Sequence, residues 1–132
     1  MRTFIACIFL ALMLFAPITS AQKAATSATQ FYMDYRAAWG KATSIEALLP
    51  YLSRDGRAEI EATPKDKRQM MFQMMKTMGN MSNVKVVKEN PQGDSYLLDL
   101  TAVGPDKKPM TGTAEIVMEG GAMKLKKETW KS

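Results

Sequence analysis

The fold is decided by residues 83–131, NVKVVKENPQGDSYLLDLTAVGPDKKPMTGTAEIVMEGGAMKLKKETWK, where apolar and polar side chains alternate. Such alternation is typical of β-strands that bury one face. Turn-forming residues interrupt the pattern at 90–94, at 104–108 and at Gly120-Gly121. We therefore predict four strands, at 83–89, 95–103, 110–119 and 122–131, joined in chain order as an antiparallel meander.

The alternation also predicts which residues face the core. On the second strand these are Tyr96, Leu98, Leu100 and Ala102, and on the third Met110, Gly112, Ala114, Ile116 and Met118. The fourth strand places Met123 and Leu125 on one face and Lys124, Lys126 and Glu128 on the other. Trp130 has the parity of the charged face, so either a bulge turns it inward or it packs on the outside.

The residues before the strands have helical spacing. A first helix is predicted from residue 26 or 27 to Gly40. Its inner face carries Phe31, Tyr35, Ala38 and Trp39. Ser44 caps a second helix, which Pro50 kinks or which ends by Leu49. The inner residues of this second helix are Ile45, Leu48, Leu49 and Leu52.

Residues 53–56 are predicted to break the second helix, and 57–62 to form a short helical piece. The next helix is predicted with Thr63 as its N-cap, Pro64 as its first residue and Gly79 at its C-terminal end. Helices first and a meander after them predict an α+β fold, with the N-terminal helices packed on one face of the four-stranded sheet.

The first 21 residues have the pattern of an export signal. Arg2 precedes an apolar run over residues 4–15, Pro17 ends that run, and residues 19–21 are small. The run is shorter than the roughly 20 residues that span a bilayer, which argues against a retained anchor. Cys7 lies inside the run, which argues against lipid attachment. We predict cleavage near Ala21 and a single mature domain, 22–132, in the bacterial periplasm or secreted.

Beyond residue 21 the sequence contains neither cysteine nor histidine. This composition excludes thiol chemistry, histidine general bases, histidine metal sites and disulfides. Loss of Arg2 with the signal leaves 17 basic and 13 acidic residues, a net charge of +4. The basic residues are dispersed rather than gathered in a stripe, so no nucleic-acid partner is predicted.

The sequence as a whole resembles small exported bacterial members of the nuclear transport factor 2-like (cystatin-like) superfamily, including lumazine-binding-like domains. The segments that carry the resemblance are Phe31-Tyr32-x-x-Tyr35, Gly93-Asp94-Ser95-Tyr96-Leu97 and the closing Gly120-Gly121-Ala122-Met123-Lys124-Leu125 through Trp130. The resemblance implies a cone-like fold, in which a curved sheet wraps around helices and can leave a cavity at its open end. These are packing and turn motifs, so they imply no particular activity.

An apolar pocket is the candidate site. Its predicted lining is Tyr35, Trp39, Met71, Met75, Ile116 and Trp130. A catalytic acid would need to face that pocket, beside a donor such as Tyr32, Tyr35 or Tyr96. The acids on ordered elements are all predicted to face outward: Asp34, Asp99, Glu115 and Glu119. We therefore predict no catalytic residue, no cofactor and no metal site.

Six methionines fall within residues 70–81. Their flexible thioethers are predicted to fill core space beneath the sheet or to line an apolar pocket, because each buried methionine contributes roughly 1.5–3 kcal/mol. The alternative is a Cu(I) site, since thioethers one helical turn apart suit that soft ion.

The functional prediction is a non-enzymatic exported binding or accessory domain. Its candidate partners are a small apolar ligand, an envelope protein or a second copy in a homodimer, and no membrane span remains after signal cleavage. The alternatives are a small isomerase or hydrolyase that uses a cavity carboxylate, and a methionine-based Cu(I) carrier. An inward acid beside a tyrosine in an open cavity would favour the enzyme, whereas a closed cone filled with methionines would favour an interaction protein.

Overall fold

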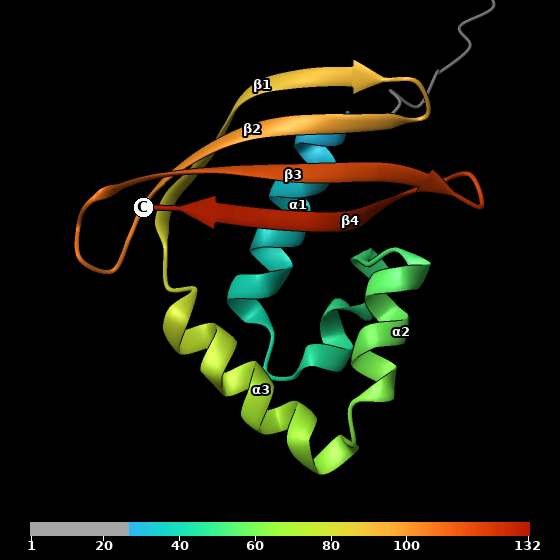
Figure 1. Ribbon diagram of the computed structural model, residues 1–132, viewed down its shortest axis with the longest axis vertical. Helices are drawn as coiled ribbons and strands as arrows, with labels where there is room; N and C mark the ends of the chain where they lie inside the picture. Colours follow the sequence, from blue (N-terminus) through green and yellow to red (C-terminus); the bar gives the residue numbers. More distant parts are fainter. Residues whose placement is uncertain (1–26) are drawn as a thin grey trace, which may run out of the picture.

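The computed structural model describes residues 27–132, so the predicted signal segment lies outside the described residues. Four helical segments precede four strands (Figure 1). The helices are α1 (Ala28–Lys41), the 3-10 helix η1 (Ile45–Tyr51), α2 (Arg54–Ala62) and α3 (Lys65–Met78). The strands are β1 (Ser82–Gln92), β2 (Ser95–Val103), β3 (Pro109–Glu119) and β4 (Ala122–Lys131). None of the helices in 27–132 has both the length and the apolarity needed to cross a membrane.

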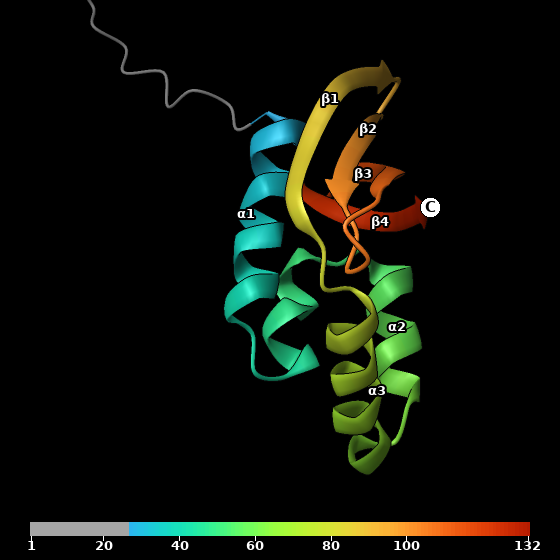
Figure 2. The same ribbon diagram turned by 90° about the vertical axis from the view of Figure 1, so that its left-hand side faces the viewer.

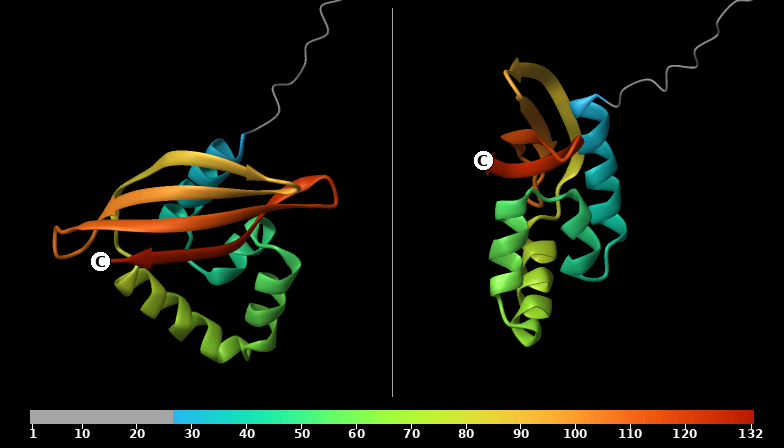
Figure 3. Two further views of the ribbon diagram at one scale, coloured as in Figure 1. Left: turned by 45° about the horizontal axis from the view of Figure 1, so that its top comes forward. Right: turned by 90° about the vertical axis from the view of Figure 1, so that its right-hand side faces the viewer.

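The strands form one antiparallel sheet in the order β1-β2-β3-β4, which confirms the predicted α+β fold and meander. The sheet is curved, and α1 runs across one of its faces (Figures 1 and 2). The segments η1, α2 and α3 lie beyond the β4 edge of the sheet, and α2 and α3 diverge from their junction as the arms of a V (Figures 1 and 3). Only α1 therefore covers the sheet face, and the other helices extend the domain past one edge.

The core lies between α1 and the sheet. Leu98 and Leu100 of β2 and Ala114 and Ile116 of β3 are buried, which confirms the predicted inner faces of these strands. The buried residues of α1 are Ala28, Tyr32, Tyr35 and Trp39. Tyr32, which was not placed on the predicted inner face, is fully buried, because the curved sheet covers a wider part of α1 than a flat one would.

The helix boundaries differ from prediction around residues 50–65. Pro50 lies inside η1, because a short 3-10 segment accommodates it where an α-helix would be kinked. Ser53 begins α2 instead of ending a helix: its hydroxyl accepts a hydrogen bond from the Gly56 amide at 3.4 Å. Thr63 ends α2 rather than capping the next helix, and α3 starts after Pro64.

Strand β1 extends through residues 90–92, which were predicted as a turn. The turn shrinks to Gly93-Asp94, with Gly93 at a φ of 61°. Pro91 is tolerated inside β1 because this is an edge strand and proline cannot donate to a sheet ladder. The other edge strand, β4, is partly covered, since Leu52 forms a parallel bridge with Leu125 and the Ser53 amide donates to the Leu125 carbonyl at 2.8 Å.

A β-bulge in β4 changes which side chains face inward. Ile116 pairs with Leu125, but Glu115 pairs with Lys127, so β4 has one residue more than β3 at this point. Lys126 and Lys127 are therefore both exposed. Beyond them the alternation continues with Glu128 and Trp130 on the inner face. Of the two alternatives for Trp130, the bulge is the one observed. The predicted outward position of Glu128 is wrong for the same reason.

Gly112 is needed where β3 passes under Trp130. A Cβ atom at Gly112 would lie 2.6 Å from both the Thr129 carbonyl oxygen and the Trp130 ring. We expect Gly112→Ala to lower the free energy of unfolding by about 1–3 kcal/mol, as overpacking does. Urea denaturation followed by circular dichroism measures this change.

Gly40→Ala is the matched control, because its new Cβ would meet no atom within 4 Å on α1. It should leave stability unchanged or raise it by up to about 1 kcal/mol. Equal unfolding midpoints for Gly112→Ala and the unmodified protein would contradict the close approach of β3 and Trp130.

Candidate functional site

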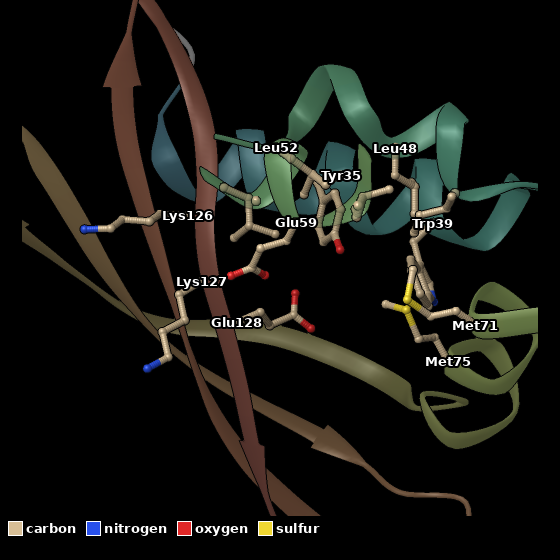
Figure 4. A pocket seen from close by; sticks show the side chains of 14 residues that line it. Tyr35, Trp39, Leu48, Leu52, Glu59, Met71, Met75, Lys126, Lys127 and Glu128 are labelled. Atoms are coloured by element: carbon tan, nitrogen blue, oxygen red, sulfur yellow. The ribbon is translucent and has the colours of Figure 1, made fainter. Parts of the chain in front are cut away.

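A pocket of about 360 Å³ opens between the arms of the V, the end of α1 and strand β4 (Figure 4). Five elements and the segment around Leu52 contribute to its lining. The residues are Tyr35, Trp39, Ile45, Leu48, Leu52, Gly56, Glu59, Ile60, Met71, Met75 and 125–128. Its volume lies in the range typical of small-molecule sites, roughly 300–1,000 Å³. The pocket exists because α2 and α3 diverge and leave the space between them unfilled.

Most of the pocket wall is apolar and rigid. Ile45, Leu48 and Leu125 are buried. Trp39 is held edge-on against Phe72 of α3, with ring centroids 5.8 Å apart. The Lys76 ammonium lies 5.4 Å from the Trp39 ring centroid and donates to the Trp39 carbonyl oxygen, which fixes the C-terminal half of α3 to the end of α1.

Glu128 is the acid that the bulge turns into the domain. Its Oε1 accepts a hydrogen bond from Trp130 Nε1 at 2.6 Å and lies 3.4 Å from the Arg36 guanidinium. The side chains of Arg36 and Glu128 are only 12% and 16% exposed, so this ion pair is largely shielded from water. Both contacts fix the position of the carboxylate beside α1.

Two tyrosines of α1 lie next to this carboxylate. Burial raises the pKa of Tyr32 and of Tyr35 well above the usual value, and the negative charge of Glu128 raises both further, while Arg36 acts in the opposite direction. Neither the Tyr32 hydroxyl nor Glu128 Oε2 has a hydrogen-bond partner among residues 27–132. Both phenols therefore stay neutral at physiological pH.

The polar groups that face the pocket are mostly acceptors. In Figure 4 the carboxylates of Glu59 and Glu128 and the hydroxyl of Tyr35 point into the space between α2 and β4. Lys126 and Lys127 point away from it, on the outer side of β4. The arrangement suits a ligand with an apolar body and a hydrogen-bond donor. Within residues 27–132, no three His, Cys, Asp or Glu side chains are grouped so that they could hold a metal ion.

Four of the six residues predicted to line a pocket do line this one: Tyr35, Trp39, Met71 and Met75. Ile116 is instead fully buried in the core, and Trp130 packs against that core beside Glu128. None of the four acids predicted to face outward lines the pocket. Glu59 and Glu128 are the polar lining that sequence reasoning missed. The position of Trp130 could have predicted the inward position of Glu128. The two residues are two apart on one strand, so a bulge that turns Trp130 inward turns Glu128 inward too.

Met71 and Met75 line the pocket, but the prediction that the methionines of α3 fill the core beneath the sheet is wrong. Met70, Met74 and Met78 are 70%, 58% and 74% exposed, and Met75 is 40% exposed. The single fully buried residue of α3 is Phe72. The physical reason is the position of α3: it lies beyond the β4 edge rather than beneath the sheet, so most of its surface has no partner within residues 27–132.

No protein-family model and no curated protein matches this chain. Its fold is similar to that of RPA3114, a SEC-C motif containing protein from Rhodopseudomonas palustris, with a TM-score of 0.58 and 9% identity over 79% of this chain and 78% of that one. A second solved structure is a hypothetical protein with a ketosteroid isomerase-like fold from Catenulispora acidiphila, in complex with trimethylamine. It gives a TM-score of 0.48 and 14% identity over 80% of this chain and 87% of that one. At these identities the similarity concerns the fold alone.

Arg36→Met should destabilise the protein by about 3 kcal/mol, because it leaves the carboxylate of Glu128 shielded from water without its cation. Arg57→Met is the matched control, since Arg57 pairs with Glu61 on the surface, where their side chains are 47% and 54% exposed. This substitution should lower the free energy of unfolding by at most about 1 kcal/mol. Urea unfolding of both variants measures the difference. Equal losses in the two variants would show that the Arg36–Glu128 pair is no more shielded than a surface pair.

Stability should fall as the pH rises through the usual tyrosine value of 10.0, because Tyr35 ionises more readily in the unfolded chain than in the folded one. The contribution of the neutral Tyr35 phenol to the free energy of unfolding is fully present below that pH and is lost above it. Unfolding free energies measured across this range should fall less steeply for Tyr35→Phe than for the unmodified protein. Parallel curves would mean that the phenol of Tyr35 is not desolvated by folding.

Proposed function

We propose that the protein binds a small, largely apolar ligand in the pocket between α2, α3 and β4. The observation that carries this proposal is the acid turned into a pocket whose wall is mostly apolar: Glu128 is held by Arg36 and Trp130 instead of being solvated. Ligand sites combine an apolar wall with a few fixed polar groups, which is the composition found here. Glu128, Glu59 and the Tyr35 hydroxyl orient the polar end of the ligand, and Trp39, Met71 and Met75 contact its apolar body.

We propose further that the protein acts outside the cytoplasm, as a distant member of the nuclear transport factor 2-like superfamily. The export pattern of residues 1–21 supports the location. The order of helices before a curved four-stranded meander supports the superfamily, as does the pocket between the helices and β4. A binding role in that compartment agrees with a sequence that has no cysteine or histidine beyond residue 7.

An enzyme is the second candidate, because Glu128 lies inside the domain beside Tyr32 and Tyr35. A cavity carboxylate next to neutral phenols is an arrangement used for proton transfer. In this site, however, the Arg36 cation and the Trp130 N–H both contact the same oxygen of Glu128. These contacts fix the carboxylate in place as a hydrogen-bond acceptor, so ligand binding is the better supported function.

Nile red, a neutral apolar dye that brightens in apolar surroundings, is a suitable probe for the pocket. The full chain should bind it saturably. Gly56→Leu should weaken binding at least tenfold, because Gly56 lines the pocket and its new Cβ would meet only ordinary contacts at 3.7 Å, so that the side chain can fill the space without disrupting α2. A titration followed by dye fluorescence measures both affinities.

Ala58→Leu provides the control, since Ala58 is an exposed residue of the same helix that does not line this pocket. It should bind the dye as the unmodified chain does. Equal binding by the Gly56 variant would mean that the dye and, by extension, an apolar ligand occupy another part of the surface. Native mass spectrometry of the protein purified from its own cells would then identify any natural ligand that copurifies.

A further inference from the structure

The core does not explain the exposed methionines of α3, and the proposed pocket explains only Met75 among the three nearest its C-terminal end. Met74, Met75 and Met78 are 58%, 40% and 74% exposed. Burial of a methionine contributes to stability, whereas an exposed one leaves apolar surface in water. Many other residue types would form this helix equally well. Three neighbouring methionines exposed to water therefore point to a use for their sulfur atoms.

The three methionines lie within little more than one turn of α3. Residues three and four apart lie on the same side of a helix, with Cβ atoms about 5–6 Å apart. Met78 is four residues after Met74 and three after Met75, so the three form a compact triangle on α3. Met70 precedes Met74 by one turn and extends the exposed row. Flexible methionine side chains can bring three sulfur atoms to one point from this spacing.

The surrounding charges leave this triangle accessible to a cation. The Lys76 ammonium donates to the Trp39 carbonyl oxygen. The Arg68 guanidinium donates to the carbonyl oxygens of Glu61 and Thr63 and pairs with Glu46 at 3.6 Å. These two cationic side chains of α3 are therefore held by groups other than the thioethers.

We propose that Met74, Met75 and Met78 form a surface site for Cu(I). Thioethers are soft ligands that select Cu(I) over the harder divalent metals, and they remain competent without deprotonation. Residues 27–132 contain no cysteine or histidine, so these methionines are the softest clustered donors in that part of the chain. The site adjoins the proposed ligand pocket, because Met75 also contributes to the pocket wall, whereas Met74 and Met78 do not.

Competition with bicinchoninic acid, a colorimetric Cu(I) chelator, tests this proposal under anaerobic conditions with the full chain. The unmodified protein should withdraw one Cu(I) at micromolar concentration. Met74→Leu/Met75→Leu/Met78→Leu should weaken that binding at least tenfold and keep the fold, because leucine conserves the side-chain volume. The single variant Met78→Leu, at the most exposed of the three positions, should also weaken it.

Met33→Leu/Met118→Leu is the matched control, because these two methionines are also exposed, at 36% and 43%, but lie outside α3. It should bind Cu(I) as the unmodified protein does. In methyl-labelled protein, the redox-stable analogue Ag(I) should shift the signals of Met74, Met75 and Met78 and leave Met33 unchanged. No Cu(I) binding by the unmodified protein, or equal binding by the triple variant, would overturn the proposal.

Discussion

The one extra residue in β4 is the constraint on which the rest of the site depends. Without the bulge at Lys126, strict alternation would place Leu125 and Lys127 on the inner face and send Glu128 and Trp130 into solvent. With it, two lysines in succession face water and the inner face receives an acid and an indole. Inside the domain the carboxylate of Glu128 requires polar partners. Arg36 provides a cation and the indole of Trp130 donates a hydrogen bond. The bulge therefore converts a lysine-rich edge strand into one wall of a pocket.

Periodicity predicted the architecture because it reports local geometry. The inner faces of β2 and β3 follow from strict alternation, and the caps and glycines place the helices to within a few residues. The predicted boundaries of helices and strands were less accurate wherever the same residues are compatible with two local structures. Ser53 followed by Arg54 and Asp55 can end one helix or begin another, and Pro91 near Gly93 can mark a turn or an edge strand. Tertiary position decides between them.

The site was less predictable than the fold for a related reason. Four aromatic and methionine residues of the pocket could be named because helical spacing puts them on one side of α1 or α3. The burial of α3 could not be predicted, since an amphipathic pattern does not say whether a partner is present. The same pattern that suggested a covered helix belongs here to one that extends past the sheet, with Phe72 inserted beside Trp39 and the remaining thioethers in water.

The two margins of the sheet limit how copies of this protein can associate. The β4 margin is partly sealed by the backbone of Leu52 and Ser53. The β1 margin remains open, but it carries Pro91, the exposed lysines Lys85 and Lys88, and two breaks in its pairing with β2. Such features are how natural sheets resist indefinite strand-by-strand growth. Growth of a ribbon by addition of strands is therefore disfavoured at both edges, so that association between copies of this domain would have to use a face of the sheet or of a helix.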